Sequence, residues 1–111
     1  MPSINLDWSP SEEKIARAAY DAAVEAALAE VMAELKRQAA AAKASSDMWE
    51  IEDYLRNARR DIDTMFIYRY SKLPDVFAYA IHKGYIDEAR LGGLADDKLS
   101  VIRRFLSFGH G

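Results

Sequence analysis

A single unbroken helical pattern covers almost the first half of this 111-residue chain and limits the folds that it can adopt. Ser9-Pro10-Ser11-Glu12 predicts a helix start, because Ser9 can cap, Pro10 suits the first helical position and Glu12 completes a capping box. No break in the pattern follows until about Ala44. Roughly 34 residues with a rise of about 1.5 Å each make a rod of about 50 Å, which is too long for a monomer of this size to bury.

The apolar stripe along this first helix is thin. Its larger members are Tyr20, Val24, Leu28, Val31 and Leu35. Most of the other apolar positions are alanine, which favours helix and lets another helix come close but buries little area of its own. The rod therefore requires a second helix along much of its length, and the polar turn at 44–46 can send that helix back antiparallel.

The second helix is predicted to begin at Asp47, in a capping box with Glu50, and to continue to about Tyr70. Apolar residues follow one another along it at spacings of three and four, which is typical of a helix laid along another helix. They are Met48, Ile51, Leu55, Ala58, Ile62 and Met65. Two half-covered hairpins can finish burying their stripes by pairing, so we predict a two-fold homodimer along this stripe and the first helix.

Short helices are predicted in the last third of the chain. Pro74 suits the first turn of a helix at 75–83, and Gly84 is expected to end it in the left-handed conformation. A brief turn of helix at 87–91 and a last helix from Asp96 follow. The side chains expected to face inward are Val76, Phe77, Ala80, Ile81, Leu99, Ile102, Phe105 and Leu106.

The predicted fold is therefore all-α. Two long antiparallel helices form a stalk, and the short helices form a small head. We expect a single domain over 1–111, made of an extended arm at 1–8, the stalk at 9–71 and the head at 72–108, with a loose tail from Phe108 onward.

Composition argues against several classes of partner. The net charge of −3 and the pI near 5.3 argue against nucleic acid, which requires a concentrated basic surface. No apolar run approaches the roughly 18 residues of a membrane span, and the N-terminus has no signal-peptide pattern. The absence of cysteine fits a reducing cytoplasm, so we expect a cytoplasmic protein.

No set of residues suggests catalysis. The two histidines, His82 and His110, form no His-x3-His or Glu-x-x-His pair that could build a metal site on a helix. The carboxylate pairs at 61–63 and 96–97 stand where surface faces and helix starts usually carry acids. The glycine pair at 92–93 lacks the lysine and the strand-to-helix setting of a phosphate loop. We therefore predict no enzyme activity, no metal and no cofactor.

The second helix has another face, which is charged but carries a tryptophan. It consists of Trp49, Glu52, Asp53, Arg56, Arg59 and Arg60. Either another part of the fold covers the Trp49 ring or a partner does, since tryptophan and arginine are frequent at interface hot spots. An acid such as Asp53 could orient arginines beside the ring. A structural ion pair at the subunit interface is the alternative interpretation.

Aromatic residues gather where the second helix meets the predicted head. They are Tyr54, Phe66, Tyr68, Tyr70, Phe77, Tyr79 and Tyr85. Most are expected in the core, because aromatic rings supply a large buried area in a small domain. One or two exposed tyrosines could form part of a partner surface.

The order and spacing of several motifs resemble the fluorescence recovery proteins of cyanobacteria. Trp49 is followed by Asp53, then Arg59, then Asp-Ile-Asp at 61–63 and Tyr-Arg-Tyr-Ser at 68–71. Shorter matches extend the similarity over nearly the whole chain, at Trp8-Ser9 with Glu12, at 76–78, at Gly84 and at 93–99.

The resemblance implies an all-helical homodimer that binds the photoactivated orange carotenoid protein. Members of that family speed the return of this client to the resting orange form, which ends the quenching of antenna fluorescence. No bonds are made or broken in that action. The resemblance also implies that Trp49, Asp53 and Arg59 serve dimerisation and client binding, with Glu52 and Arg60 beside them. The location would be the cytoplasm, or the cytoplasmic face of thylakoids through the client.

Two positions depart from the family pattern. Glu52 stands where the family often has histidine, and Asp75 stands where its head helix often has an aromatic or aliphatic residue. Each change adds a negative charge to a surface that could be desolvated on binding, which would weaken docking. The alternative hypothesis is therefore a divergent dimer of the same family with another protein partner and no photoprotective role.

Overall fold

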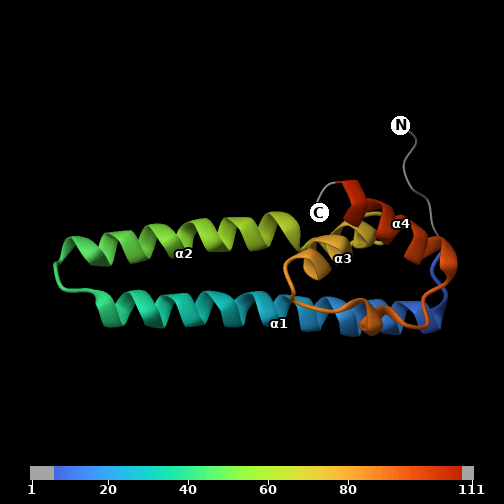
Figure 1. The fold of residues 1–111 in the computed structure, drawn as a ribbon, viewed down its shortest axis with the longest axis horizontal. Helices are drawn as coiled ribbons and strands as arrows, with labels where there is room; N and C mark the ends of the chain where they lie inside the picture. Colours follow the sequence, from blue (N-terminus) through green and yellow to red (C-terminus); the bar gives the residue numbers. More distant parts are fainter. Residues whose placement is uncertain (1–6, 109–111) are drawn as a thin grey trace.

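The computed structural model describes residues 7–108, and every regular element in this range is helical. Helix α1 (Pro10–Ala41) and helix α2 (Ser46–Met65) lie side by side as a long hairpin, the stalk (Figure 1). Helix α3 (Leu73–His82), the 3-10 helix η1 (Glu88–Leu91) and helix α4 (Asp96–Phe108) form the head. The head packs on the N-terminal half of α1, and the molecule is 53 Å long. The predicted all-α stalk and head are confirmed.

The start of α1 follows its sequence. The Ser9 hydroxyl accepts the backbone N–H of Glu12 at 3.2 Å, and the Ser9 N–H donates to the Glu12 carboxylate at 3.0 Å, so the predicted capping box is confirmed. The helix ends at Ala41, three residues before the predicted end at Ala44.

The turn between the long helices corrects one prediction. Helix α2 begins at Ser46, so Asp47 lies within its first turn and does not cap it. The Asp47 carboxylate instead accepts the backbone N–H groups of Lys43 and Ala44 at 2.8 and 3.0 Å. These two hydrogen bonds lower the pKa of Asp47, and the bond from Lys43 has the larger effect. The acid therefore ties down the turn that folds the chain back.

Helix α2 ends at Met65, not at Tyr70 as predicted, because Phe66 packs into the core at the base of the head. Phe66 leaves the helical region (φ −91°, ψ 81°) and its ring is buried. The ring packs near Tyr20, Tyr79 and Tyr85, and the Tyr20 hydroxyl donates to the Phe66 carbonyl at 2.9 Å. Tertiary contacts thus override a local preference for helix at 66–70.

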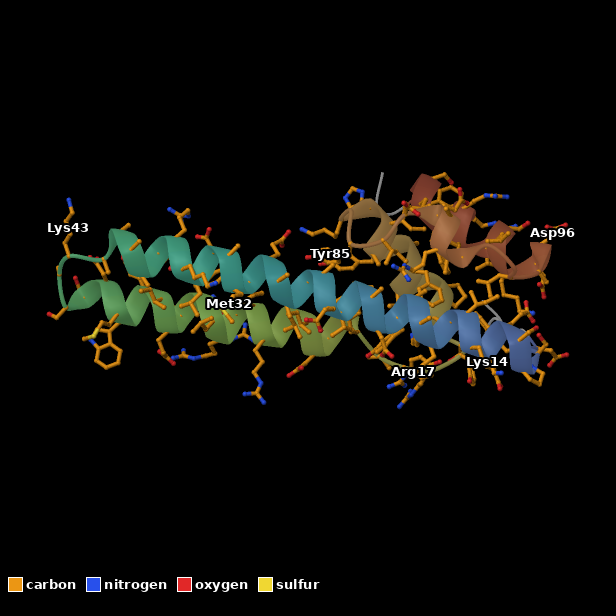
Figure 2. All side chains as sticks on the ribbon, turned by 90° about the horizontal axis from the view of Figure 1, so that it is seen from below. Lys14, Arg17, Met32, Lys43, Tyr85 and Asp96 are labelled. Atoms are coloured by element: carbon orange, nitrogen blue, oxygen red, sulfur yellow. The ribbon has the colours of Figure 1, made fainter. Side chains whose placement is uncertain are left out.

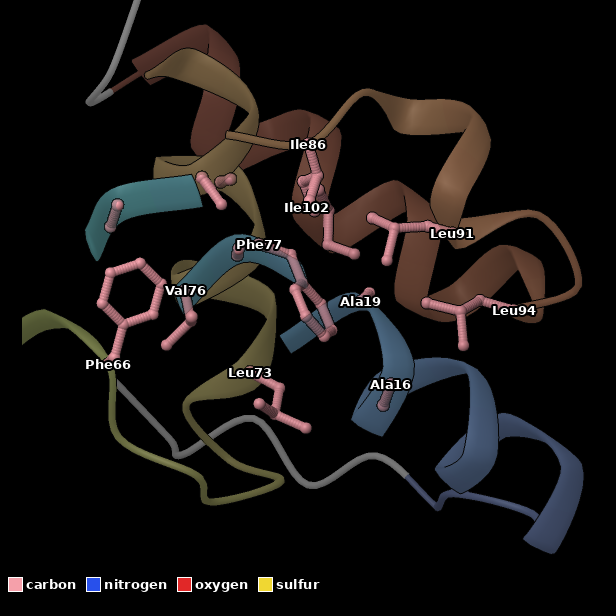
Figure 3. Packing of buried hydrophobic residues seen from close by; sticks show 14 residues of the cluster. Ala16, Ala19, Phe66, Leu73, Val76, Phe77, Ile86, Leu91, Leu94 and Ile102 are labelled. Carbon is pink, nitrogen blue, oxygen red and sulfur yellow. The ribbon is translucent and has the colours of Figure 1, made fainter. Parts of the chain in front are cut away.

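The head holds most of the buried core. Figure 3 shows Phe77 pointing from α3 toward α1, beside Ala19. Phe77, Leu73, Leu91 and Ile102 are fully buried. Four residues predicted as inward-facing pack against this core but are only half-buried: Ile81, Leu99, Phe105 and Leu106. Helix α3 begins two residues earlier than predicted, at the buried Leu73.

The face of α1 under the head differs from the predicted stripe. Its buried apolar residues are Ala16, Ala19, Ala23 and Ala27, whereas Leu28 is 46% exposed. Because alanine has no bulk beyond Cβ, the head elements can approach the α1 backbone closely and place their own large side chains there. The alanines thus form the surface of α1 on which the head packs.

A buried ion pair fastens the head to the start of α1. The Glu12 carboxylate accepts the backbone N–H of Ala95 at 2.8 Å and the Lys98 ammonium at 3.2 Å, and both side chains are buried. Lys98 also donates to the Asp7 carbonyl and pairs with Asp97 at 3.4 Å. Hydrogen bonds from the Ser9 and Ala95 backbone, opposed by burial and helped by Lys98, lower the pKa of Glu12 to about 2.

The ends of the chain are described in part. Trp8 is half-buried and its ring lies 5.5 Å from that of Tyr70. Phe108 belongs to α4 and is 82% exposed, so it is not part of a loose tail as predicted. The rest of the predicted tail, at 109–111, and the arm at 1–6 lie outside the described residues.

Candidate partner-binding surface and dimer interface

The outward face of α2 carries the tryptophan and the charges that the sequence singled out. Trp49 is 66% exposed, so within residues 7–108 no other part of the fold covers its ring. Of the two interpretations of Trp49, the one in which this chain itself covers the ring is therefore wrong for the described residues.

Arg56 is the arginine of this face that pairs with Glu52 and Asp53. Its Nη2 donates to both Glu52 oxygens at 2.5 and 2.6 Å, and its Nη1 lies 3.7 Å from an Asp53 oxygen. The hydrogen bonds with Glu52 are the main reason that the pKa of Arg56 is raised. All three side chains are more than half exposed, so the cluster is solvated and contributes little to stability.

Arg59 and Arg60 are placed apart from that cluster. Arg59 is 86% exposed and lies 3.9 Å from the carboxylate of Asp63, one turn further along α2. Arg60 is exposed and forms no ion pair within residues 7–108. The structure does not join Asp53 to Arg59, although both lie on the exposed side of the same helix. The guanidinium groups of Arg59 and Arg60 are exposed to solvent and therefore accessible to acidic groups of a partner.

The predicted dimer stripe is partly covered by α1. Ile51, Leu55, Ala58, Ile62 and Met65 are half-buried, Met48 is 56% exposed, and α2 has no fully buried residue. An apolar groove of about 480 Å³ runs between the stalk helices. Its walls are Leu28, Val31, Leu55, Ala58 and Ile62, with Arg59 and Asp63 at the edge.

Further apolar groups lie along the same hairpin. Met32 is 51% exposed, and Figure 2 shows it on the stalk, away from the head. With Leu28, Met48 and Trp49, it makes four of the seven large apolar side chains that are exposed in residues 7–108. Exposed apolar groups that gather on one part of a protein are typical of interaction surfaces, so the hairpin is the candidate for one.

A second hollow, which sequence reasoning did not predict as a site, lies where stalk and head meet. This cleft of about 240 Å³ is lined from α1, α2 and α3 and by Tyr85. The sequence did show the aromatic cluster at this junction, but its acidic partners Glu30 and Asp61 carry no local pattern that would assign them to it.

The described residues contain no cluster of three or more metal-ligating side chains, and no helix among them is long and apolar enough to cross a membrane. His82 lies on α3, and His110 lies outside the described residues.

The fold and the exposed side chains first define a class: an elongated helical protein with exposed apolar side chains on a long hairpin. A sequence model of the family described as photoprotection regulator fluorescence recovery protein matches residues 8–105. This chain belongs to the fluorescence recovery protein family, a family of regulators of photoprotection.

Individual relatives agree with that assignment. The chain is 31% identical over 96 residues to the fluorescence recovery protein of Synechocystis sp., covering 86% of this chain and 88% of that protein. The solved structure of the Fremyella diplosiphon protein matches with a TM-score of 0.83 at 31% identity, over 89% of this chain and 97% of that one. The solved structure from Synechocystis sp. PCC 6803 matches with a TM-score of 0.85 at 30% identity, over 91% and 99%.

Proposed function

We propose that this protein binds the photoactivated orange carotenoid protein and accelerates its return to the resting orange form, which ends antenna quenching. The observation that carries the proposal is membership of the fluorescence recovery protein family over residues 8–105. The proposal includes a cytoplasmic location, at the face of thylakoids when the client is there, with no nucleic acid among the partners.

The proposed action is a population shift that breaks no bond. A protein that binds the separated domains of its client, in an arrangement close to their reassociated state, favours reassociation by the difference in binding free energy between the two states. Such a helper needs an exposed surface and no catalytic group. Trp49, Asp53 and Arg59, with Glu52 and Arg60 beside them, are the proposed partner-binding residues.

The proposed working form is a homodimer. The interface residues are Met48, Ile51, Leu55, Ala58, Ile62 and Met65. The groove between the stalk helices supports this proposal, because its apolar walls are half-exposed in one copy and a second stalk would cover them. The helical domain at 1–111 is proposed to act as one unit, with its arm at 1–8, stalk at 9–71 and head at 72–108.

One observation supports the alternative, a dimer of the same fold with a different protein client. Glu52 holds Arg56 through two short contacts of 2.5 and 2.6 Å. An acid at position 52 thus engages a guanidinium that would otherwise be available to a client, and it leaves a carboxylate on the binding face. Asp75 adds a half-buried acid at the start of α3.

The dark decay of the red form of an orange carotenoid protein tests the proposal. Adding this protein should speed the decay with rising concentration, without any cofactor. Arg59→Leu should weaken the effect, because a guanidinium can bridge acidic groups and an aliphatic chain cannot. Glu52→His should strengthen it if the negative charge at 52 limits docking. No acceleration by a folded dimer with a competent client would contradict the proposal and favour the alternative.

A further inference from the structure

The cleft at the junction of stalk and head adjoins the apolar groove. Val31, Ala58 and Ile62 line both, so the two hollows lie on either side of one packed layer between α1 and α2. On α2 the groove is lined by Leu55 and the cleft by Tyr54, and these neighbouring residues point in different directions on a helix.

Aromatic rings form one wall of the cleft. Phe66, Tyr79 and Tyr85 contact one another, with ring centroids 6.3 Å apart in each pair. The position of Tyr85 follows from the end of α3. Gly84 has a φ of +78° and donates to the Ile81 carbonyl, and the Tyr85 N–H donates to the Ala80 carbonyl at 2.9 Å. This pattern is a Schellman motif, which fixes where the next side chain points.

Two acids complete the lining, one from each stalk helix. Glu30 of α1 accepts the Tyr85 hydroxyl at 3.2 Å, which is a bond to a neutral group. Asp61 of α2 is exposed and forms no ion pair within residues 7–108. Lys83, at the end of α3, supplies a single positive charge on the lining. The two carboxylates outnumber that cation, so the cleft carries an excess of negative charge.

The tyrosines keep their protons in this environment. Burial raises the pKa of Tyr85 to about 12, and the charge of Glu30 adds to that rise. Burial also raises the pKa of Tyr54, with Glu34 and Glu30 contributing. Neutral phenol rings next to carboxylates favour a positive ligand, because the ring faces carry partial negative charge.

We propose that this cleft binds an arginine side chain of a protein partner. A guanidinium can form paired hydrogen bonds with a carboxylate, can stack on an aromatic face, and is more weakly hydrated than an ammonium group. The cleft volume of about 240 Å³ lies below the range of roughly 300–1,000 Å³ that is usual for drug-sized ligands, which fits one side chain and not a cofactor. The proposal rests on the proposed function only for the statement that the arginine comes from a protein client.

The test uses N-acetyl-arginine amide as the probe, with the full chain and no client. Shifts of the Tyr54 and Tyr85 amide resonances on titration should saturate with a Kd in the millimolar range, on the order expected for one side chain. N-acetyl-citrulline amide, the neutral isostere, should bind at least about tenfold more weakly, because it lacks the charge. Guanidinium chloride should also bind more weakly, because it lacks the stem that lies on the rings.

Matched variants locate the binding. Glu30→Gln and Asp61→Asn should each weaken probe binding about three- to tenfold, whereas Lys83→Gln should strengthen it, because a like charge is removed. Glu25→Gln is the control, since it removes the same charge from an exposed position of α1 outside the cleft. Glutamine at 30 can still accept the Tyr85 hydroxyl, so the junction should keep its structure.

Three results would overturn the proposal: no saturable shift up to tens of millimolar probe, equal binding of the citrulline isostere, or undiminished binding in both Glu30→Gln and Asp61→Asn. Guanidinium chloride that binds as tightly as the probe would assign the cleft to a free cation and overturn the side-chain assignment. Because no client is present, failure here is distinguishable from failure of the recovery assay.

Discussion

The head and the stalk of this molecule differ in how completely their side chains are buried. In the head, Phe77, Leu73, Leu91 and Ile102 have no exposed surface, and a buried ion pair between Glu12 and Lys98 joins it to α1. The outer stalk helix, α2, has no fully buried residue and carries a tryptophan that is 66% exposed. A chain of 111 residues can form only a modest core, and this one concentrates its burial at one end. The other end leaves apolar side chains exposed, and these are the side chains proposed to contact other chains.

The largest effect expected from this contrast is on stability. Phe77→Ala should lower the free energy of unfolding by about 3–5 kcal/mol, because it removes a fully buried ring and leaves a cavity. Trp49→Ala removes a larger but exposed ring and should change the stability of the protomer by less than about 1 kcal/mol. Urea unfolding followed by circular dichroism, at fixed protein concentration, measures both. Equal losses would mean that the stalk tryptophan is part of the folded core.

A pH profile tests the same contrast with two carboxylates whose pKa values are both lowered to about 2 from 4.5. Glu12 is buried, and its low pKa comes first from backbone hydrogen bonds with Ser9 and Ala95. Glu34 is on the stalk, and its low pKa comes first from Arg37, which donates to it at 2.5 and 2.8 Å.

The sign follows from the lowered pKa of Glu12. The folded state holds the proton less tightly than the unfolded one, so the stabilisation is complete above about pH 4.5 and is lost as the pH falls toward about 2. Its size is on the order of 3 kcal/mol. Glu12→Gln should therefore flatten acid unfolding over this range. Glu34→Gln should change it much less, since solvent screens an exposed pair. A reversed order of the two variants would contradict the burial assigned to Glu12.

A smaller effect is expected at the proposed partner-binding face, which carries Trp49, Glu52 and Asp53. Asp53→Leu should weaken client binding more than Glu52→Gln, by about 1 kcal/mol, because it removes an acid and adds an apolar group to the face that carries Trp49. Titration of the client in its photoactivated form measures the two affinities. Equal losses from both variants would mean that the face acts through its overall charge. Glu52 and Asp53 both lie near the Arg56 guanidinium, so the two variants compare the loss of one or the other acid beside the same cation.

The features that were predictable from the sequence are those set by neighbouring residues. The Ser9 capping box and the left-handed Gly84 depend on groups within five positions of each other, and α4 begins at Asp96 as predicted. Local spacing also predicted the stripe on α2 and the antiparallel hairpin, and the family resemblance was confirmed.

The features that were not predictable depend on contacts between distant parts of the chain. Helix α2 stops at Met65 because Phe66 fits a pocket of rings contributed by α1, α3 and the following loop. Glu12 reads locally as a capping residue, yet it also binds Lys98, 86 residues away. The alanines of α1 were predicted to let another helix come close and to bury little area, but the sequence did not show which of them the head would cover. The Glu30–Tyr85 bond, which shapes the cleft, spans 55 residues.

Sedimentation at micromolar concentration tests most directly whether the stalk is the half of the molecule that pairs. The unmodified protein should sediment with about twice its monomer mass of 12.5 kDa. Leu55→Glu and Ile62→Glu should yield folded monomers, because each places an unpaired charge in the apolar contact between two stalks. Thr64→Glu, which adds the same charge at an exposed position of α2, should remain a dimer. A monomeric unmodified protein, or dimers that persist in both Leu55→Glu and Ile62→Glu, would contradict the account.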